Sequence, residues 1–176
     1  EVVNDILIPA LDSAGKLFEQ GKIFLPQLIQ TASVAQAAFE VIKTTLIERN
    51  AAPVSRGEIV LATVKGDIHD IGKNIVRVLL ENYGYTVLDL GRDVPCQLVA
   101  DTAKEHGVKL VGLSALMTTT LGAMEETIQL VKASCPDCKI VVGGAVLTAD
   151  YAEKIGADYY AKDAMETVAV AKEVVG

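Results

Sequence analysis

Apolar residues follow a helical period in the first quarter of the chain and a strand-like pattern afterwards. From Ile6 to Phe18 they recur at spacings of three and four, which predicts an amphipathic helix. Gly21 suits a left-handed helix end, and Pro26 suits the first residue of a second helix that we expect to run to about Glu48. Two helices this apolar cannot bury their side chains alone, so they need partner helices or a neighbouring domain.

The rest of the chain alternates short apolar runs, rich in β-branched residues, with helical patterns. We expect strands at Ile59–Val64, Thr86–Leu90, Val108–Leu113, Lys139–Val142 and Asp158–Tyr160, and helices near 72–82, 96–106, 121–134, 149–155 and 164–174. Alternation of this kind predicts right-handed crossovers and a parallel sheet covered on both faces. Five strands fit an α/β, flavodoxin-like, doubly wound (Rossmann-like) domain, whose ligand lies beyond the strand C-termini.

Three regions follow from these patterns. Residues 1–50 form a helical unit, residues 51–57 a polar linker broken by Pro53 and Gly57, and residues 58–176 the α/β domain. Because the chain does not begin with Met, we expect it to be a processed or excised piece.

Composition narrows the function classes. Apolar residues make up 51% and charged residues 22%, the balance of a globular protein with a real core. The net charge is −7 without a Lys/Arg cluster, which disfavours nucleic-acid binding. No apolar stretch approaches the ~20 residues that cross a membrane, and no signal peptide is visible. Cys135 and Cys138 are expected to be a reduced loop pair, so we expect a cytoplasmic protein.

The candidate chemistry lies where the first strand passes into the first helix of the α/β domain, in the segment from Lys65 to Gly72, KGDIHDIG. It lacks the glycine and Lys-Ser/Thr arrangement of a phosphate-binding loop. A neutral imidazole such as His69 is a good metal ligand through one nitrogen, and the carboxylate of Asp67 can orient the other. Gly66 and Gly72 are expected to permit the turn and the close approach of a bulky ligand.

A lone D-x-H would more often be a helix cap, but three further features favour a ligand site. Ser114 directly follows the third strand, and an uncharged, hydroxyl-rich loop runs from Leu116 to Thr120. Gly143 and Gly144 end the fourth strand and leave a slot without side chains.

Together D-x-H-x-x-G, S-x-L and G-G, preceded by helices, resemble the cobalamin-binding module of methionine synthase and related corrinoid methyltransferase proteins. The resemblance covers essentially all 176 residues. It implies a cobalamin bound with its own base displaced, and His69 as the lower ligand of cobalt. Asp67 would be the partner of the His69 ring, and Thr120, where the family has a serine, would complete the relay.

The remaining roles follow from the same resemblance. The ligand loop would comprise Gly66, Asp67, Ile68, His69 and Asp70, with Gly72 after it; Ser114, Leu116 and Thr118 would contact the corrin or nucleotide; Gly143 and Gly144 would line the slot for the nucleotide tail, closed by Ala164. The helical unit would cover the upper corrin face through Phe18, Leu25 and Leu28, and Asn4 stands where some relatives carry a glutamate near the corrin. Since the family has four helices there and this chain two, we expect a partial, N-terminally truncated four-helix bundle.

The function implied is that of a methyl carrier that cycles between cob(I)alamin and methylcobalamin. The first reading is the cobalamin module of methionine synthase, partnered by homocysteine- and methyltetrahydrofolate-binding domains. The alternative is a free-standing corrinoid protein that serves methyltransferase proteins for methylamine or methanol. A cobalamin-binding sensor domain, a cobalamin-dependent mutase and a flavodoxin-like domain without metal remain as further alternatives.

Overall fold

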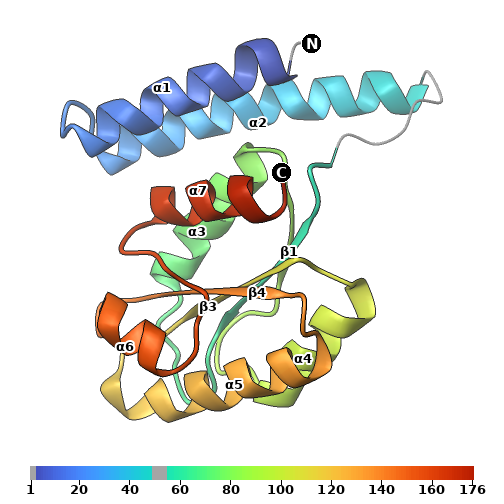
Figure 1. The fold of residues 1–176 in the computed structure, drawn as a ribbon. Helices are drawn as coiled ribbons and strands as arrows, with labels where there is room; N and C mark the ends of the chain where they lie inside the picture. Colours follow the sequence, from blue (N-terminus) through green and yellow to red (C-terminus); the bar gives the residue numbers. More distant parts are fainter. Residues whose placement is uncertain (1–2, 49–54) are drawn as a thin grey trace.

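The computed structural model describes residues 3–48 and 55–176, so most of the predicted 51–57 linker lies outside the described residues. The strands are β1 (Glu58–Thr63), β2 (Thr86–Asp89), β3 (Leu110–Ser114), β4 (Lys139–Gly143) and β5 (Tyr159–Tyr160). The α-helices are α1 (Ile8–Glu19), α2 (Leu25–Glu48), α3 (Ile71–Asn82), α4 (Cys96–His106), α5 (Leu121–Ser134), α6 (Ala149–Lys154) and α7 (Ala164–Val174). Figure 1 shows the helical pair α1–α2 lying over one side of an α/β domain.

The sheet has the predicted parallel, doubly wound topology. Its strand order is β2-β1-β3-β4-β5, and every neighbouring pair is parallel. The chain therefore leaves β1 toward one side of the sheet and β3 toward the other. This makes the gap between the carboxyl ends of β1 and β3 the switch point, where doubly wound folds hold their ligands.

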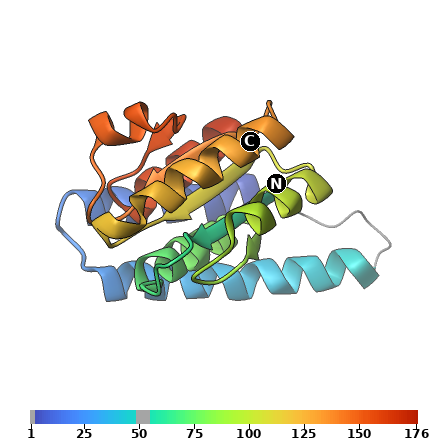
Figure 2. The ribbon, with the colours of Figure 1, turned by 90° about the horizontal axis from the view of Figure 1, so that it is seen from below.

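Two apolar cores sandwich the sheet. Helices α3 and α7 pack on one face, and α4, α5 and α6 pack on the other (Figures 1 and 2). Strand residues alternate between the cores, so that Val60 joins the α4–α5 side and Ile59 the α3–α7 side. Most residues of the inner strands β1, β3 and β4 are buried, which explains why these strands read as nearly continuous apolar runs.

The helical pair α1–α2 buries its inner face on the α3–α7 layer. Leu11, Leu28 and Ala32 are almost fully buried in the same core as that layer. A polar contact adds to this core: Lys172 of α7 pairs with Asp12 of α1 and lies over the ring of Tyr83, 4.7 Å from its centroid. The α/β domain is thus the neighbour that the apolar helices were predicted to need.

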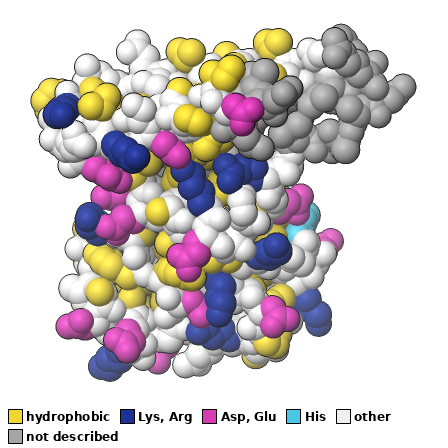
Figure 3. Space-filling model, turned by 45° about the horizontal axis from the view of Figure 1, so that its top comes forward, with side chains coloured by type: hydrophobic (Ala, Val, Ile, Leu, Met, Phe, Trp, Pro, Cys, Tyr) yellow, Lys and Arg dark blue, Asp and Glu magenta, His cyan; other side chains and the backbone are white. Residues whose placement is uncertain are grey.

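The outer face of the pair stays apolar and exposed. Phe24, Val34 and Val41 are 73%, 71% and 67% exposed, and Figure 3 shows hydrophobic side chains along this edge of the molecule. Across the described residues, none of the helices has both the length and the apolar character that a bilayer crossing demands.

Most of the predicted strand and helix boundaries are shifted by one or two residues in the structure, and local hydrogen bonding explains two of the differences described here. The first helix begins as a π-helical turn, Val3–Leu7, and becomes α-helical just before Pro9, which has no N–H to bond to the preceding turn. Helix α2 begins at Leu25, one residue before Pro26. Strand β3 starts at Leu110 because the Val108 N–H is taken by Ala103 at the end of α4.

Candidate functional site

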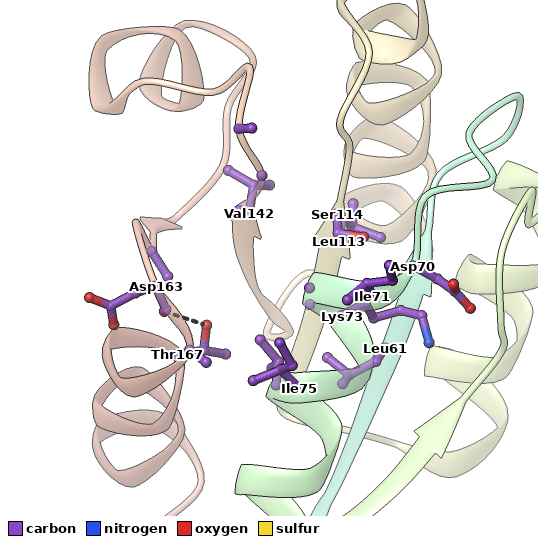
Figure 4. A pocket seen from close by; sticks show the side chains of 18 of the residues that line it. Leu61, Asp70, Ile71, Lys73, Ile75, Leu113, Ser114, Val142, Asp163 and Thr167 are labelled. Carbon is purple, nitrogen blue, oxygen red and sulfur yellow. Dashed lines mark hydrogen bonds between the residues drawn. The ribbon is translucent and has the colours of Figure 1, made fainter. Parts of the chain in front are cut away.

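A cavity of about 840 Å³ opens at the carboxyl ends of β1, β3 and β4. The β1–α3 loop contributes Ile68, His69 and Asp70, and the α1–α2 end contributes Phe18, Leu25 and Leu28. Figure 4 shows the cavity between the β1–α3 segment, the end of β3, β4 and the start of α7. The cavity thus connects the candidate metal ligand to the helical pair on one side and to the Gly143–Gly144 turn on the other.

The Asp67 carboxylate holds the ring of His69. Asp67 Oδ1 lies 2.8 Å from His69 Nδ1 and also accepts the backbone N–H of His69 at 3.0 Å. This is the compact turn that aspartate forms with the residue two positions later. An ionised Asp67 fixes the proton on Nδ1, so Nε2 carries the lone pair and can ligate a metal. The His69 side chain is 46% exposed, while that of Asp67 is fully buried.

The second carboxylate oxygen of Asp67 binds the loop after β3. Oδ2 accepts the backbone N–H of Leu116 at 2.7 Å and that of Met117 at 3.2 Å. The hydroxyl of Thr120 lies 3.2 Å from the same oxygen and 2.8 Å from the Met117 carbonyl, and its single proton serves one of them at a time. The predicted contact of Thr120 with Asp67 is therefore present; its role in a relay stays a prediction.

Asp67 is held as an anion in spite of its burial. Burial by itself raises the pKa of the carboxyl group, but the hydrogen bonds from His69, Leu116 and Met117 outweigh it and lower the pKa from 3.8 to about 2. A permanent negative charge behind the imidazole makes Nε2 more basic and fixes the ring orientation.

Most of the predicted site residues surround this one cavity. Those that line it are Phe18, Leu25, Leu28, Ile68, His69, Asp70, Gly72, Ser114, Leu116, Gly143, Gly144 and Ala164. Gly66 and Asp67 of the loop that carries His69, and Thr120, which contacts Asp67, do not line the cavity. Thr118 is exposed in a short turn and does not line it either, and the side chain of Asn4 lies outside the described residues.

The glycines act differently from one another. Gly66 has φ +85°, as a tight turn requires. The prediction that Gly72 permits the turn is wrong, because it lies within the first turn of α3 without a positive φ. At Gly144 a Cβ would stand 1.9 Å from the Ala115 carbonyl oxygen, and at Gly143 one would stand 3.0 Å from the Ala161 oxygen. The chain's own backbone therefore excludes a side chain at Gly144 and leaves little room for one at Gly143, before any ligand is considered.

Of the cavity wall formed by the end of β5 and the residues after it, the sequence analysis predicted Ala164 and missed the rest. Tyr160, Lys162, Asp163 and Met165 all line it. The fold rule that ligands lie beyond the carboxyl ends of the strands could have located these residues, because they end β5 or follow it closely. Ile71, 79% exposed at the start of α3, was also missed.

Two other candidates stay structural. Cys138 is buried, and this burial raises the pKa of its thiol to about 12, which disfavours the thiolate that a nucleophile or a metal ligand needs. His106 Nδ1 lies 3.0 Å from Glu58 on the surface, at the opposite end of the sheet from His69.

The side chains around the cavity suit a metal ion that receives most of its ligands from a bound group and not from the protein. Within residues 3–48 and 55–176, no group of three or more His, Cys, Asp or Glu side chains could hold an ion. A protein-only metal site needs such a group, whereas a macrocycle-bound metal needs only one axial nitrogen. His69 supplies one such nitrogen at the edge of a large, mainly apolar cavity.

Comparison with known proteins agrees with this geometry. Residues 57–169 match the family model described as B12 binding domain, and residues 1–43 match a second model of the same description. The chain is 43% identical to dimethylamine corrinoid protein 1 of Methanosarcina acetivorans, covering 99% of this chain and 83% of that protein.

Two solved structures are also similar. A cobalamin-binding protein from Desulfitobacterium hafniense superposes with a TM-score of 0.80 at 36% identity, covering 94% of this chain and 78% of that one. The methanol:cobalamin methyltransferase complex of Methanosarcina barkeri gives 0.83 at 30% identity, covering 99% and 66%.

The buried charge of Asp67 predicts a pH-dependent stability. Because its pKa is lower in the folded chain, ionised Asp67 stabilises the fold above its ordinary pKa of 3.8, and this contribution is lost as the pH falls toward 2. It amounts to about 2 kcal/mol, of which about 1 kcal/mol disappears between pH 6 and pH 3. The asparagine side chain does not titrate. The free energy of unfolding of Asp67→Asn should therefore lie further below that of the wild type at pH 6 than at pH 3.

The measurement is urea denaturation of both proteins without corrinoid at the two pH values. Other acidic groups titrate in both proteins, so the difference in unfolding free energy between the two proteins isolates the contribution of Asp67. A stability gap that stays constant from pH 6 to pH 3 contradicts the lowered pKa.

Proposed function

Because the chain belongs to the B12-binding domain family, whose cofactor is cobalamin, we propose that it is a corrinoid methyl carrier serving methylamine methyltransferases. When bound, cobalamin supplies a cobalt centre that accepts a methyl group and gives it up. The protein itself orients the cofactor, provides the lower ligand and limits access to the upper face.

The observation that carries the proposal is the Asp67–His69 pair at the edge of the cavity. Nδ1 of His69 is occupied by the buried carboxylate, so Nε2 is the nitrogen left to ligate cobalt. Asp67 holds the ring in place whether or not a metal is bound, because its hydrogen bonds come from the protein backbone. The imidazole can thus bind and leave the cobalt without a collapse of its loop.

The far end of the cavity suits the nucleotide tail of the cofactor. The lining there includes Gly143, Gly144, Ala164 and the apolar Val142, of which Val142 is labelled in Figure 4. The helical pair suits the opposite role, since Phe18 and Leu25 present apolar side chains to the same cavity. An apolar cover protects a reactive alkyl–metal bond from water and must move aside for transfer.

The relatives favour the methylamine alternative over the methionine-synthase reading. The dimethylamine corrinoid protein aligns along 99% of this chain, helical pair included. A second similar chain belongs to the methanol:cobalamin methyltransferase complex of Methanosarcina barkeri. Homocysteine- and methyltetrahydrofolate-binding domains find no support among these proteins.

The methyl donor tests the proposed function. The protein carrying reduced cobalamin is mixed with a dimethylamine:corrinoid methyltransferase and dimethylamine, and methylation of cobalt is followed by visible absorption. Parallel mixtures contain methanol with its methyltransferase, or methyltetrahydrofolate with the folate domain of a methionine synthase. We expect rapid methylation of the cobalt in the mixture that contains dimethylamine. If methyltetrahydrofolate is the one donor of the three that methylates the cobalt, the proposal is overturned in favour of a methionine-synthase module.

The cover formed by the helical pair can be tested with two phenylalanines, Phe18 at the end of α1 and Phe24 just before α2. Phe18 is partly buried and lines the cavity, whereas Phe24 is 73% exposed and does not. Phe18→Ala should speed photolysis of bound methylcobalamin several-fold, because a looser cage lets the methyl radical escape before it recombines; Phe24→Ala should not. Photolysis rates under fixed illumination give the answer, and equal rates for Phe18→Ala and wild type show that the pair does not shield the methyl group.

A further inference from the structure

The loop that carries His69 has no regular secondary structure, so its position depends on its neighbours. One neighbour is the segment between β2 and α4, residues 90–95. Its residue Asp93 has φ +53°, the one positive value among the described non-glycine residues. A backbone conformation this unfavourable persists only where surrounding contacts impose it, and such residues cluster at functional sites.

The carboxylate and the backbone N–H of Asp93 both bind peptide groups of the loop just before His69. Its carboxylate accepts the N–H of Gly66 at 2.7 Å, and its own N–H donates to the carbonyl of Asp67 at 2.9 Å. Two successive residues of the loop are thereby tied to the end of β2.

The last residue of β2 holds the first turn of the helix that follows the loop. Asp89 pairs with Lys73, which is 3% exposed in the first turn of α3, and accepts the N–H of Gly91 at 2.9 Å. The His69 loop is therefore fixed on its two sides, at Gly66 and Asp67 by Asp93 and at Lys73 by Asp89. Asp93 does not line the cavity, so it can reach the cofactor only through the loop.

We propose that Asp93 is a positioning residue for the cobalt ligand. It holds the backbone around Asp67 so that the Asp67–His69 pair presents Nε2 to the cavity before any cofactor arrives. This deepens the proposed function and rests on it. The role concerns geometry: the loop is preorganised, and the His69 ring does not have to search for the metal.

Three substitutions separate the carboxylate from the backbone conformation. Asp93→Asn keeps an oxygen acceptor and tolerates the left-handed region, so it should behave like wild type. Asp93→Gly tolerates that region but loses the acceptor, and Asp93→Ala loses both. Because glycine removes the backbone strain, Asp93→Gly is expected to fold, which its thermal unfolding checks.

The first measurement uses the protein without corrinoid. Amide exchange of Gly66 should be roughly five- to ten-fold faster in Asp93→Gly than in wild type, because its acceptor is gone. The second uses bound cob(II)inamide, which lacks the nucleotide base, so that any axial nitrogen seen by EPR comes from the protein. In Asp93→Gly the ratio of nitrogen-coordinated to uncoordinated cobalt should fall about ten-fold, and Asp93→Asn should restore it.

His69→Ala distinguishes the two levels of failure. If it leaves the axial nitrogen in place, the proposed function itself is wrong. If it removes the nitrogen while Asp93→Gly leaves the coordinated ratio at the wild-type value, only the positioning role is overturned, whatever happens to amide exchange or thermal stability.

Discussion

The buried carboxylate of Asp67 joins the two loops that leave the sheet on either side of its switch point. One oxygen holds the ring and the N–H of His69 after β1, and the other holds Leu116 and Met117 after β3. A buried charge is tolerated only when it is fully hydrogen-bonded, so the two loops cannot separate without leaving that charge unpaired. The position of the candidate cobalt ligand and the folding of this end of the sheet thus depend on the same group.

Polar contacts hold the side of the His69 loop that faces away from the cavity, and apolar residues line the side that faces it. Behind the loop, Asp93 and Asp89 fix the backbone through hydrogen bonds and an ion pair. In front, Phe18 and Leu25 of the helical pair and the glycine turn after β4 enclose an apolar cavity. His69 is held in place by hydrogen bonds, whereas the helical pair that covers the cavity packs largely through apolar contacts. This arrangement suits a carrier, which must keep its cofactor while admitting two reaction partners in turn.

Much of this could be predicted from the sequence where the determinants are local. The Asp67–His69 contact spans two residues and follows from the turn-forming habit of aspartate. The sheet order follows from alternating strand and helix patterns. By contrast, the bonds from Leu116 to Asp67 cross 49 positions, and the left-handed conformation of Asp93 has no signal in a pattern of apolar residues. The steric need for glycine at 144 arises from Ala115 of another loop.

That His69 supplies the lower nitrogen of the cofactor, in place of the cofactor's own base, is tested most directly by isotope labelling. The protein is produced with ¹⁵N-histidine, loaded with unlabelled cobalamin, reduced to the cob(II) state and measured by EPR. Coordination by His69 predicts that each cobalt line is split into two by the ¹⁵N nucleus. Splitting into three, as the ¹⁴N of the cofactor's base produces, contradicts it.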